Sequence, residues 1–394
     1  MWCLRLIAMT TRSSVLHRTR RAATVLGMRV VCSFVGGAGH LVPQIPLHRA
    51  LATDGHTLVL SGRASAMGAA PRQLYSRIVA REDPRNGAAG SISPLTPVDM
   101  EHELNAVGDY FAGRAAWRTA EHIRGLLPGA GLVVCDELDF GAMAAAQEAG
   151  IPTVVVAVIA SGALVRSERL RGPLGALSSS LTHAGPIRPH GDFFVVPFAP
   201  SMRDPDFPTP PNSLWMRPDI GSEPRPDGSL VATLGTEFNT ESGDLFDRIL
   251  AALTKLGIPA TVAIGRDLDP AQFGRQPEFL NVEQYVDFDA LLPRASTVMH
   301  HGGSGLFTRC ILGGAPQIVF PMGADQPFTA RQVSRLGVGR VLDPLTVTRS
   351  HIIDAVRDLQ EDSAMRERIL ELRESLVSLP SPSRVVRQLL TAAE

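Results

Sequence analysis

The chain has 394 residues, of which 44% are hydrophobic and 20% charged, and its formal net charge is −1. This is the composition of a globular protein that is long enough for two domains, each with its own core. A near-neutral chain lacks the basic surface of nucleic-acid-binding proteins, and no run of eighteen apolar residues could span a membrane. The cysteines lie far apart and form no C-x-x-C pair, so they indicate neither a disulfide framework nor a zinc knuckle, and a cytoplasmic location is expected. They are Cys3, Cys32, Cys135 and Cys310.

The first 27 residues differ from the rest because they are rich in arginine and contain no acidic residue. A transit peptide has this composition, and "MWCLRLIAM" looks like a short secretory signal without its small-residue cleavage site. We interpret residues 1–27 instead as a disordered upstream extension, with Met28 as the functional start.

From Met28 onward, short apolar runs alternate with helical patterns, which predicts parallel sheets built from β-α-β units. A cluster of prolines between Pro197 and Asp227 divides this series into two halves and is typical of a linker. In chain order, strands are expected over 28–35, 56–62, 131–138, 151–160, 229–235, 259–265, 296–301 and 316–321, and helices over 43–54, 140–150, 241–256, 305–313 and 382–393.

The predicted fold is therefore α/β, with two Rossmann-like domains whose parallel sheets face each other across a central cleft. We place the first domain at 28–205, the linker at 206–228 and the second domain at 229–380. The remaining residues, 381–394, form a C-terminal helix that could lie across either domain. Ligands of such folds bind at the carboxyl ends of the strands, so the loops that follow strands are the candidate sites.

The loop after the first expected strand reads "GGAGHLVP" and invites comparison with dinucleotide-binding loops. The G-x-G-x-x-G spacing fails because Val42 stands where the third glycine is required, and no acidic residue ends the next strand. An NAD enzyme is therefore not predicted. The loop does place His40 at the carboxyl end of a strand, where a histidine is either a packing residue or a functional group.

Asp136 follows the strand "LVVC" and should reach the same edge of the same sheet as His40. If the two side chains meet, the carboxylate fixes the imidazole tautomer and stabilises its protonated form, as in a general-base dyad. The alternative for Asp136 is a cap on the helix that starts near Phe140, a role that Asp139 could fill equally well. The sequence leaves both readings open.

The segment "VMHHGGSGLF", residues 298–307, joins an apolar strand to a helix through a run of small residues. Backbone N–H groups and the helix N-terminus can converge there on one anion, and a histidine could add a donor. Adjacent strand residues point to opposite faces, so His300 and His301 do not form an obvious metal pair. The lysine of a Walker A loop is absent, and an ordinary glycine turn is the alternative. The small residues are Gly302, Gly303, Ser304 and Gly305.

Two further loops of the second half are candidates for the same cleft. "TLGTEF" places Gly235 and Thr236 after a strand, where amides and a hydroxyl could meet a phosphate. "FPMGADQPF" ends a strand with Asp325 and Gln326, an acceptor and an amide suited to sugar hydroxyls. The alternative for this last pair is a turn with a solvated carboxylate.

The chain resembles a known family, the GT-B-fold, nucleotide-sugar-dependent glycosyltransferases of family 1. It is similar in particular to the actinobacterial members that decorate antibiotics, such as macrolides and enediynes, and other natural products. The resemblance runs from about Met28 to Leu390. The ordered histidine-glycine loop, G-x-P-Q strand and D-Q turn are specific, whereas the N-terminal half matches more loosely. The matching segments are "GGAGHLVPQIPLHRALATDGH", "LVVCDELDFGAMAAAQEAGIP", "YVDFDALLPRASTVMHHGGSGL", "GGAPQIVFPMGADQPFTARQV" and "LGVGRVL".

The resemblance implies an inverting transfer of a sugar or deoxysugar from a dTDP- or UDP-sugar to a hydroxyl of a small natural-product aglycone. The first domain would bind the acceptor and the second the nucleotide sugar, without a cofactor or metal; a homodimer is compatible with the family. His40 matches the catalytic base and Asp136 the acid that orients it. The donor residues implied are His300, Gly302, Gly303, Ser304, Gly305 and Thr236 for the diphosphate, Asp325 and Gln326 for the sugar, and Tyr285, Val286 and Leu291 for the nucleotide base.

By the same resemblance, His300 is expected to face the ligand and His301 the protein interior. Leu306 stands where the family commonly has a threonine or serine, which implies the loss of one hydroxyl contact to the phosphates, and Thr329 replaces an asparagine that is common next to the donor sugar. "DLD" at 267–269 resembles the Asp-x-Asp of metal-dependent glycosyltransferases, but we interpret it as a coincidence. Two alternatives stay open: a nucleotide-sugar 2-epimerase on the same scaffold, and a non-catalytic protein that binds a nucleotide sugar.

Overall fold

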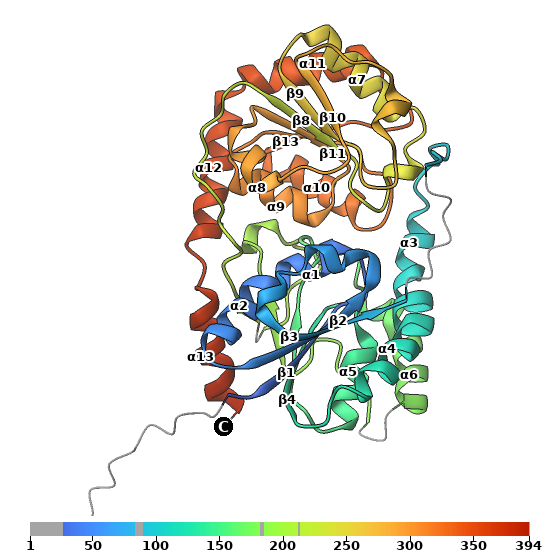
Figure 1. Ribbon diagram of the computed structural model, residues 1–394, viewed down its shortest axis with the longest axis vertical. Helices are drawn as coiled ribbons and strands as arrows, with labels where there is room; N and C mark the ends of the chain where they lie inside the picture. Colours follow the sequence, from blue (N-terminus) through green and yellow to red (C-terminus); the bar gives the residue numbers. More distant parts are fainter. Residues whose placement is uncertain (1–26, 83–89, 182–184, 212, 394) are drawn as a thin grey trace, which may run out of the picture.

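The framework consists of two parallel β-sheets stacked along the long axis of the molecule (Figure 1). The computed structural model describes residues 27–82, 90–181, 185–211 and 213–393, so almost all of the expected extension at 1–27 lies outside the described residues. From edge to edge, the first sheet consists of β3 (Tyr75–Arg81), β2 (Thr57–Arg63), β1 (Arg29–Ser33), β4 (Ala130–Asp136), β5 (Thr153–Val156), β6 (Phe193–Val196) and β7 (Leu214–Trp215). The second consists of β10 (Leu280–Glu283), β9 (Ala260–Ala263), β8 (Leu230–Thr233), β11 (Thr297–His300), β12 (Gln317–Val319) and β13 (Gly339–Val341).

All strand pairs of both sheets are parallel, which confirms the predicted α/β architecture. The central strands are mostly apolar and buried, as in residues 30–32 of β1 and 132–135 of β4, because helices cover both faces of each sheet. In β1, for example, Val31 packs into one core cluster, whereas its neighbours Val30 and Cys32 pack into the other.

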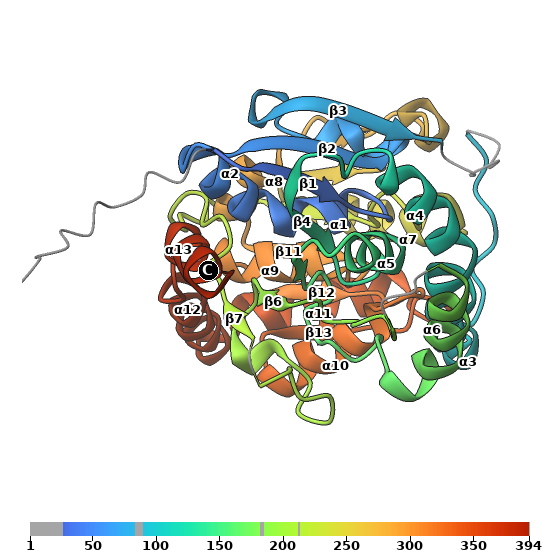
Figure 2. The same cartoon turned by 90° about the horizontal axis from the view of Figure 1, so that it is seen from below.

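Around the first sheet lie α1 (Ala38–Leu41), α2 (Ile45–Thr53), α3 (Met100–Ala106), a π-helical segment (Val107–Ala115), α4 (Ala116–Arg124), α5 (Phe140–Glu148) and α6 (Ser167–Leu181). Around the second lie α7 (Leu245–Leu256), α8 (Phe288–Leu291), α9 (Ser304–Leu312), α10 (Gln326–Leu336), α11 (Arg349–Glu361) and α12 (Ser363–Val377), and the chain ends with α13 (Pro382–Ala393). Seen from below, α2 and α13 lie on one side of the first sheet and α4, α5 and α6 on the other (Figure 2).

The C-terminal helix α13 returns to the first domain. Its residues Val385, Val386 and Leu389 are buried in the core cluster that also holds Leu47 and Leu51 of α2. Figure 1 shows α12 and α13 running down one side of the molecule, from the second sheet to the first. The choice between the two domains, which the sequence left open, is therefore decided by packing against α2.

The helix expected over 241–256 begins only at Leu245. Residues 239–241 form a short 3-10 turn, and Gly243 has a φ of +50°, which an α-helix cannot contain. Leu95, from the segment that precedes α3, packs against Gly243, where a Cβ would lie 3.2 Å from its Cγ. A contact from the first domain therefore accompanies the late start of this helix.

Both sheets direct the carboxyl ends of their strands toward each other. In each sheet the central pair, β1 with β4 and β8 with β11, lies where the strand order reverses, which is where α/β folds bind ligands. A cavity of about 170 Å³ between the domains is lined by Pro43 and Pro46 from one side and by Phe288 and Gly305 from the other. The candidate loops of both halves therefore meet in one region.

Candidate functional site

His40 and Asp136 form a hydrogen-bonded pair. His40 lies in α1, and its Nδ1 is 3.1 Å from Oδ1 of Asp136, the last residue of β4. The carboxylate also accepts the amide of Leu138 at Oδ1 and the amide of Val35 at Oδ2, each at 2.9 Å. Asp136 is thus held rigidly, and with Nδ1 committed to it, Nε2 is the nitrogen of His40 that is left for chemistry.

The cap on the following helix is Asp139, not Asp136. Asp139 accepts the amide of Ala142 at the start of α5 and the hydroxyl of Ser33. Burial and the nearby charge of Asp136 raise the pKa of Asp139. Since Asp139 takes the capping role, the capping alternative for Asp136 is wrong.

The surroundings of His40 favour its protonated form. Burial by itself would lower the pKa of the imidazole, but the charge of Asp136 and the hydrogen bond to it outweigh burial. Asp325 and Glu137 add to this effect, so the pKa is raised above its ordinary value of 6.5. The His40 side chain keeps 20% of its surface exposed, whereas Asp136 is fully buried. The imidazole is thus accessible to a substrate while its partner is not.

Two features that the sequence analysis did not identify shape the space around His40. Gly36 lies directly under the ring, and a Cβ there would be 2.1 Å from His40 Cδ2. Phe111, which belongs to the π-helical segment, stacks on the imidazole with ring centroids 6.1 Å apart and planes inclined by 20°. Such π-helical turns occur frequently at functional sites, but no simple sequence period marks them.

His300, the last residue of β11, and His301, which follows it, have different surroundings, and the expectation that His300 faces the ligand is wrong. His300 is fully buried, its Nδ1 accepts the amide of Gly302 at 3.0 Å, and its Nε2 lies 2.9 Å from Oε1 of Gln317. Both nitrogens are therefore engaged inside the second domain. Burial lowers the pKa of His300 to about 4, so the ring is neutral.

His301 is the histidine that lies beside the loop after β8. A Cβ on Gly235 would be 2.6 Å from its Cε1, and a Cβ on Gly303 would be 2.6 Å from its Nε2. The ring of Phe238 stacks on the imidazole, with centroids 6.5 Å apart. Its Nδ1 is buried and has no hydrogen-bond partner among the described residues, and burial lowers the pKa of His301 to about 3. His301 is thus a neutral ring with spare hydrogen-bonding capacity between two glycines.

The start of α9 is an open helix N-terminus. Its N-cap is Gly303, which offers no side chain to cap the first turn, and no acidic residue lies in that turn. Gly302 has a φ of +97°, and a Cβ there would lie 2.8 Å from Val319 Cγ1, so glycine is required on both counts. Gly305 and Thr236 are exposed. This geometry leaves backbone N–H groups available for an anion.

Ser304 joins the loops of the two domains. Its hydroxyl donates to Oδ2 of Asp325 at 2.5 Å and accepts the amide of Ala160, which follows β5 of the first sheet, at 2.8 Å. Burial raises the pKa of Asp325, and the hydrogen bond from Ser304 opposes that rise. Ala324, just before Asp325, is the one non-glycine residue in the described ranges with positive φ, at +51°. Such conformations cluster at functional sites.

Gln326 and the expected base-binding residues have different environments. Gln326 is buried, and its Oε1 accepts the amide of Met322. Tyr285 is 70% exposed, with the guanidinium of Arg266 5.4 Å from its ring centroid. Val286 is buried, and Leu291, the last residue of α8, packs against a small apolar cluster that includes Leu292 and Val298. Tyr285 is therefore the expected base-binding residue with an open aromatic face.

A contact between the loops after β1 and β8 adds Glu237 to the site. Its carboxylate forms an ion pair with Arg63 at 3.2 Å, and a Cβ on Gly37 would lie 2.8 Å from its Oε1. The sequence analysis missed both side chains, because the pairing joins residues that are far apart in the chain.

The "DLD" segment has a structural role in this fold. Asp269 caps a 3-10 turn by accepting the amide of Ala271, and the carbonyl of Asp267 accepts the amide of Gly90. Within the described ranges, no group of three or more histidine, cysteine, aspartate or glutamate side chains could hold a metal ion. Over the same residues, no helix is both long and apolar enough to cross a membrane.

Comparisons with known proteins agree with this architecture. Residues 248–392 match the family described as "Erythromycin biosynthesis protein CIII-like, C-terminal domain". The chain is 30% identical over 399 residues to the elloramycin glycosyltransferase ElmGT of Streptomyces olivaceus, a match that covers 93% of this chain and 97% of that protein. It is also 30% identical over 209 residues to the 10-deoxymethynolide desosaminyltransferase of Streptomyces venezuelae, but that match spans only 49% of the relative.

Solved structures show the same fold. The spinosyn rhamnosyltransferase SpnG superposes with a TM-score of 0.76 at 18% identity, over 92% of this chain and all of that one. The calicheamicin glycosyltransferase CalG4 gives a TM-score of 0.71 at 22% identity, over 93% of this chain and 98% of that one. Two parallel sheets joined in this way are the GT-B fold. The chain therefore belongs to the family of natural-product glycosyltransferases and is a glycosyltransferase.

Proposed function

We propose that this chain transfers a sugar from a nucleoside diphosphate sugar to a hydroxyl group of a small natural-product aglycone, with inversion at the anomeric carbon. The observation that carries this proposal is the His40–Asp136 pair at 3.1 Å, set opposite an open helix N-terminus and a neutral histidine. The names of relatives support the substrate classes: one is an L-demethylnoviosyl transferase, and SpnG was crystallised with thymidine diphosphate and with its spinosyn aglycone. A dTDP-deoxysugar is therefore the proposed donor.

In the first half of the reaction, His40 acts as the general base. The acceptor hydroxyl gives its proton to Nε2 of His40 while its oxygen attacks the anomeric carbon, and Asp136 stabilises the imidazolium that forms. This kind of assistance contributes roughly 10² to 10⁴ in rate. The raised pKa of His40 fits this role, since a base with a pKa near the working pH accepts the proton readily.

In the second half, the bond from the anomeric carbon to the diphosphate oxygen breaks, and the electron pair leaves with the nucleoside diphosphate. The N–H groups at the start of α9, with the positive end of its helix dipole, stabilise this charge. His301 and Thr236 are the side chains that we assign to the phosphates, and Asp325 with Gln326 to the sugar hydroxyls. Attack from the side of His40, opposite the departing diphosphate, inverts the anomeric centre.

A thermal-shift panel of dTDP, UDP, GDP and NAD tests the donor side. We expect selective stabilisation by dTDP, because binding to the native state alone raises the midpoint of unfolding. Equal shifts with all four nucleotides would contradict a nucleotide-sugar site. A second assay, with the dTDP-sugar and no acceptor, separates the alternatives: rapid conversion of the donor to its 2-epimer would contradict a transferase.

A further inference from the structure

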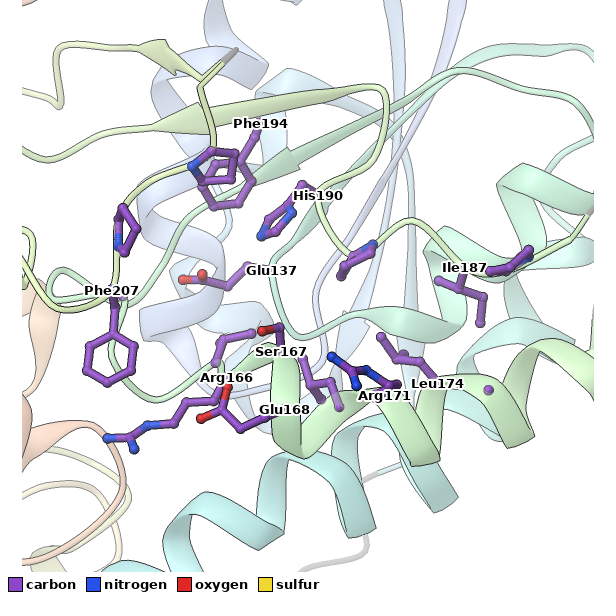
Figure 3. Close-up of a pocket in the computed structure, with 18 of the residues that line it drawn as sticks. Glu137, Arg166, Ser167, Glu168, Arg171, Leu174, Ile187, His190, Phe194 and Phe207 are labelled. Carbon is purple, nitrogen blue, oxygen red and sulfur yellow. The ribbon is translucent and has the colours of Figure 1, made fainter.

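Glu137 is a buried carboxylate that the proposed reaction leaves without a role. It directly follows Asp136, the last residue of β4, and only 4% of its surface is exposed. It lines a cavity of the first domain, and Figure 3 shows its side chain among those that surround this cavity. Because a buried carboxylate is costly unless polar groups compensate it, the groups that Glu137 binds show which part of the structure it supports.

Glu137 binds the loop that follows β5. Its Oε1 accepts the amides of Val158 and Ile159, both at 2.7 Å, and its own amide donates to the carbonyl of Val156 at 3.1 Å. Burial raises the pKa of Glu137, whereas the charge of Arg203 and the hydrogen bonds from these two amides oppose that rise. One carboxylate oxygen therefore fixes two successive peptide groups of the loop.

Arg203 holds the same loop from the carbonyl side. Its Nη1 donates to the carbonyl of Ile159 at 2.8 Å, and its Nε donates to Oγ1 of Thr209 at 3.0 Å. Gly162 leaves room for the guanidinium, because a Cβ at position 162 would lie 2.2 Å from Nη2. The loop is therefore held between a carboxylate and a guanidinium, and the next residue, Ala160, has a defined position.

This loop contacts the second domain at Ser304. The amide of Ala160 donates to Oγ of Ser304 at 2.8 Å, and the same hydroxyl donates to Oδ2 of Asp325 at 2.5 Å. A second contact lies near the other end of α10, where Nη2 of Arg335 donates to the backbone carbonyl of Arg203 at 3.3 Å. The helix that begins next to Asp325 is thus bound to the first domain near both of its ends.

These contacts end beside the proposed base. Burial and Asp136 act most strongly on the pKa of His40, and the charge of Asp325 also raises it. His40 and Asp325 therefore lie near each other, although they belong to different domains. The rate of a group transfer falls steeply when the reacting groups are misplaced, by as much as 10²-fold for about 1 Å. The contacts that fix Asp325 relative to His40 therefore matter for the reaction.

We propose that Glu137 is a positioning residue: through the loop 158–160 and Ser304, it fixes Asp325 of the second domain relative to His40 of the first. This role rests on the proposed function and concerns how the two domains are aligned for the transfer. Glu137 acts through the peptide groups that it holds, so the role requires an oxygen that accepts hydrogen bonds and does not require a charge. An amide side chain of the same length can therefore replace the carboxylate.

Loss of the acceptor should impair turnover and leave nucleotide binding unchanged. Glu137→Ala frees the amides of Val158 and Ile159, so we expect kcat/KM for the dTDP-sugar to fall at least about tenfold while the Kd of dTDP stays as in the wild type. Asp192→Ala is the matched control, because Oδ2 of Asp192 accepts the amide of Thr153 at 2.9 Å, at the opposite end of β5. This control should leave kcat/KM nearly unchanged, and equal kcat/KM values in the two variants would overturn the inference.

Two further variants distinguish positioning from a merely structural or electrostatic role. Glu137→Gln lacks the charge but keeps an oxygen for both amides, so it should retain most of the wild-type kcat/KM. A loss as large as that of Glu137→Ala would overturn the inference. Glu137→Ala and Ser304→Ala interrupt the same connection, so the double variant should lose no more than about the larger of the two single losses. Additive losses would show that Glu137 does not act through Ser304, which would also overturn the inference.

Hydrogen exchange provides a measurement that needs no turnover. In Glu137→Ala the amides of residues 158–160 should exchange at least about tenfold faster than in the wild type, and in Asp192→Ala they should not; unchanged exchange in Glu137→Ala would overturn the inference. If Glu137→Ala does not fold, Glu137→Met, which has a similar volume and no such acceptor, replaces it. A chain that folds only with a carboxylate or an amide at position 137 would overturn the positioning role.

The same measurements separate this inference from the proposed function. A wild type that transfers no sugar would refute the proposed function. Normal transfer by the wild type, with unchanged exchange in Glu137→Ala, would refute only the positioning role.

Discussion

The imidazole of His301 packs directly against Gly235. A Cβ at position 235 would lie only 2.6 Å from the ring carbon Cε1, so the imidazole occupies the space that any other residue would need for its side chain. Gly235 is thus doubly constrained, because its φ of +81° also disfavours residues with a side chain. Through this contact the loop after β8 and the loop after β11 form one surface.

Replacing Gly235 should weaken donor binding through His301. Gly235→Ala forces the imidazole away from its position, and we expect the Kd for dTDP to rise about tenfold, equivalent to about 1.4 kcal/mol. Gly257→Ala is the matched control: its φ is +67°, but nothing lies within 4 Å of its Cβ position. Alanine at a positive φ strains the backbone in both variants, and only Gly235→Ala also displaces His301. Calorimetry should therefore show weaker dTDP binding only in Gly235→Ala. Equal Kd values in the two variants would refute the role of this contact.

The two adjacent histidines should respond differently to alanine. His301→Ala should weaken dTDP binding and leave the unfolding midpoint nearly unchanged. His300→Ala should do the opposite, because the amide of Gly302 and the side chain of Gln317 lose their partners in a buried site, which costs about 1 to 3 kcal/mol. Calorimetric binding and thermal unfolding on both variants distinguish these outcomes, and a reversed pattern would restore His300 as the ligand-facing residue.

His40 and Asp136 should set the pH dependence of transfer. A general base works only when it is unprotonated, so kcat/KM should rise with pH through the raised pKa of His40, above 6.5. Asp136→Asn removes the charge that raises this pKa, so the inflection should move to lower pH while the rate falls. His40→Ala should lower transfer by roughly 10² to 10⁴ and leave dTDP binding intact. An inflection that Asp136→Asn does not move would argue against the dyad.

Ser304 should affect the sugar site more than the nucleotide site. Ser304→Ala removes the donor to Asp325 and the acceptor for the amide of Ala160. We expect KM for the dTDP-sugar to rise by about tenfold while the Kd of dTDP alone changes little, since our proposal assigns Asp325 to the sugar and not to the diphosphate. Steady-state kinetics and calorimetry test this split, and an equal loss for both ligands would indicate a general disturbance of the loop.

Buried neutral histidines should make the fold sensitive to acid. The pKa values of His48 and His301 are lowered to about 3, and that of His300 to about 4, all by burial. At pH values between these pKa values and 6.5, the unfolded chain binds more protons than the folded chain. The contribution of the three histidines to the free energy of unfolding is therefore complete above pH 6.5 and is lost as the pH falls. At pH 5 each histidine contributes up to about 2 kcal/mol of this loss. The unfolding midpoint should therefore drop between pH 7.5 and 5, and less so in His300→Gln; a midpoint independent of pH would contradict buried neutral rings.

The phosphate loop and the His40–Asp136 pair show which parts of the candidate site can be predicted from local sequence patterns. The run of strand, glycines and helix around Gly302 predicts an anion site because glycine geometry and helix dipoles act over a few residues. His40 and Asp136 were candidates because parallel strands bring their carboxyl ends to one edge. The pairing of Arg63 with Glu237, and the bridge from Ser304 to Ala160, had no such signal, because they join segments separated by 174 and 144 residues.

The sequence by itself determined the α/β architecture, the loops that carry the site and the glycines that those loops require, since these follow from periodicity and backbone sterics. Only the tertiary structure decided which of two adjacent histidines has both ring nitrogens engaged inside the domain, which of Asp136 and Asp139 caps α5, and where α13 packs. In each case the neighbouring sequence is equally compatible with two residues or two surfaces in the same role. The choice depended on partners such as Gln317, Ser33 and Leu51, which burial brings together from distant parts of the chain.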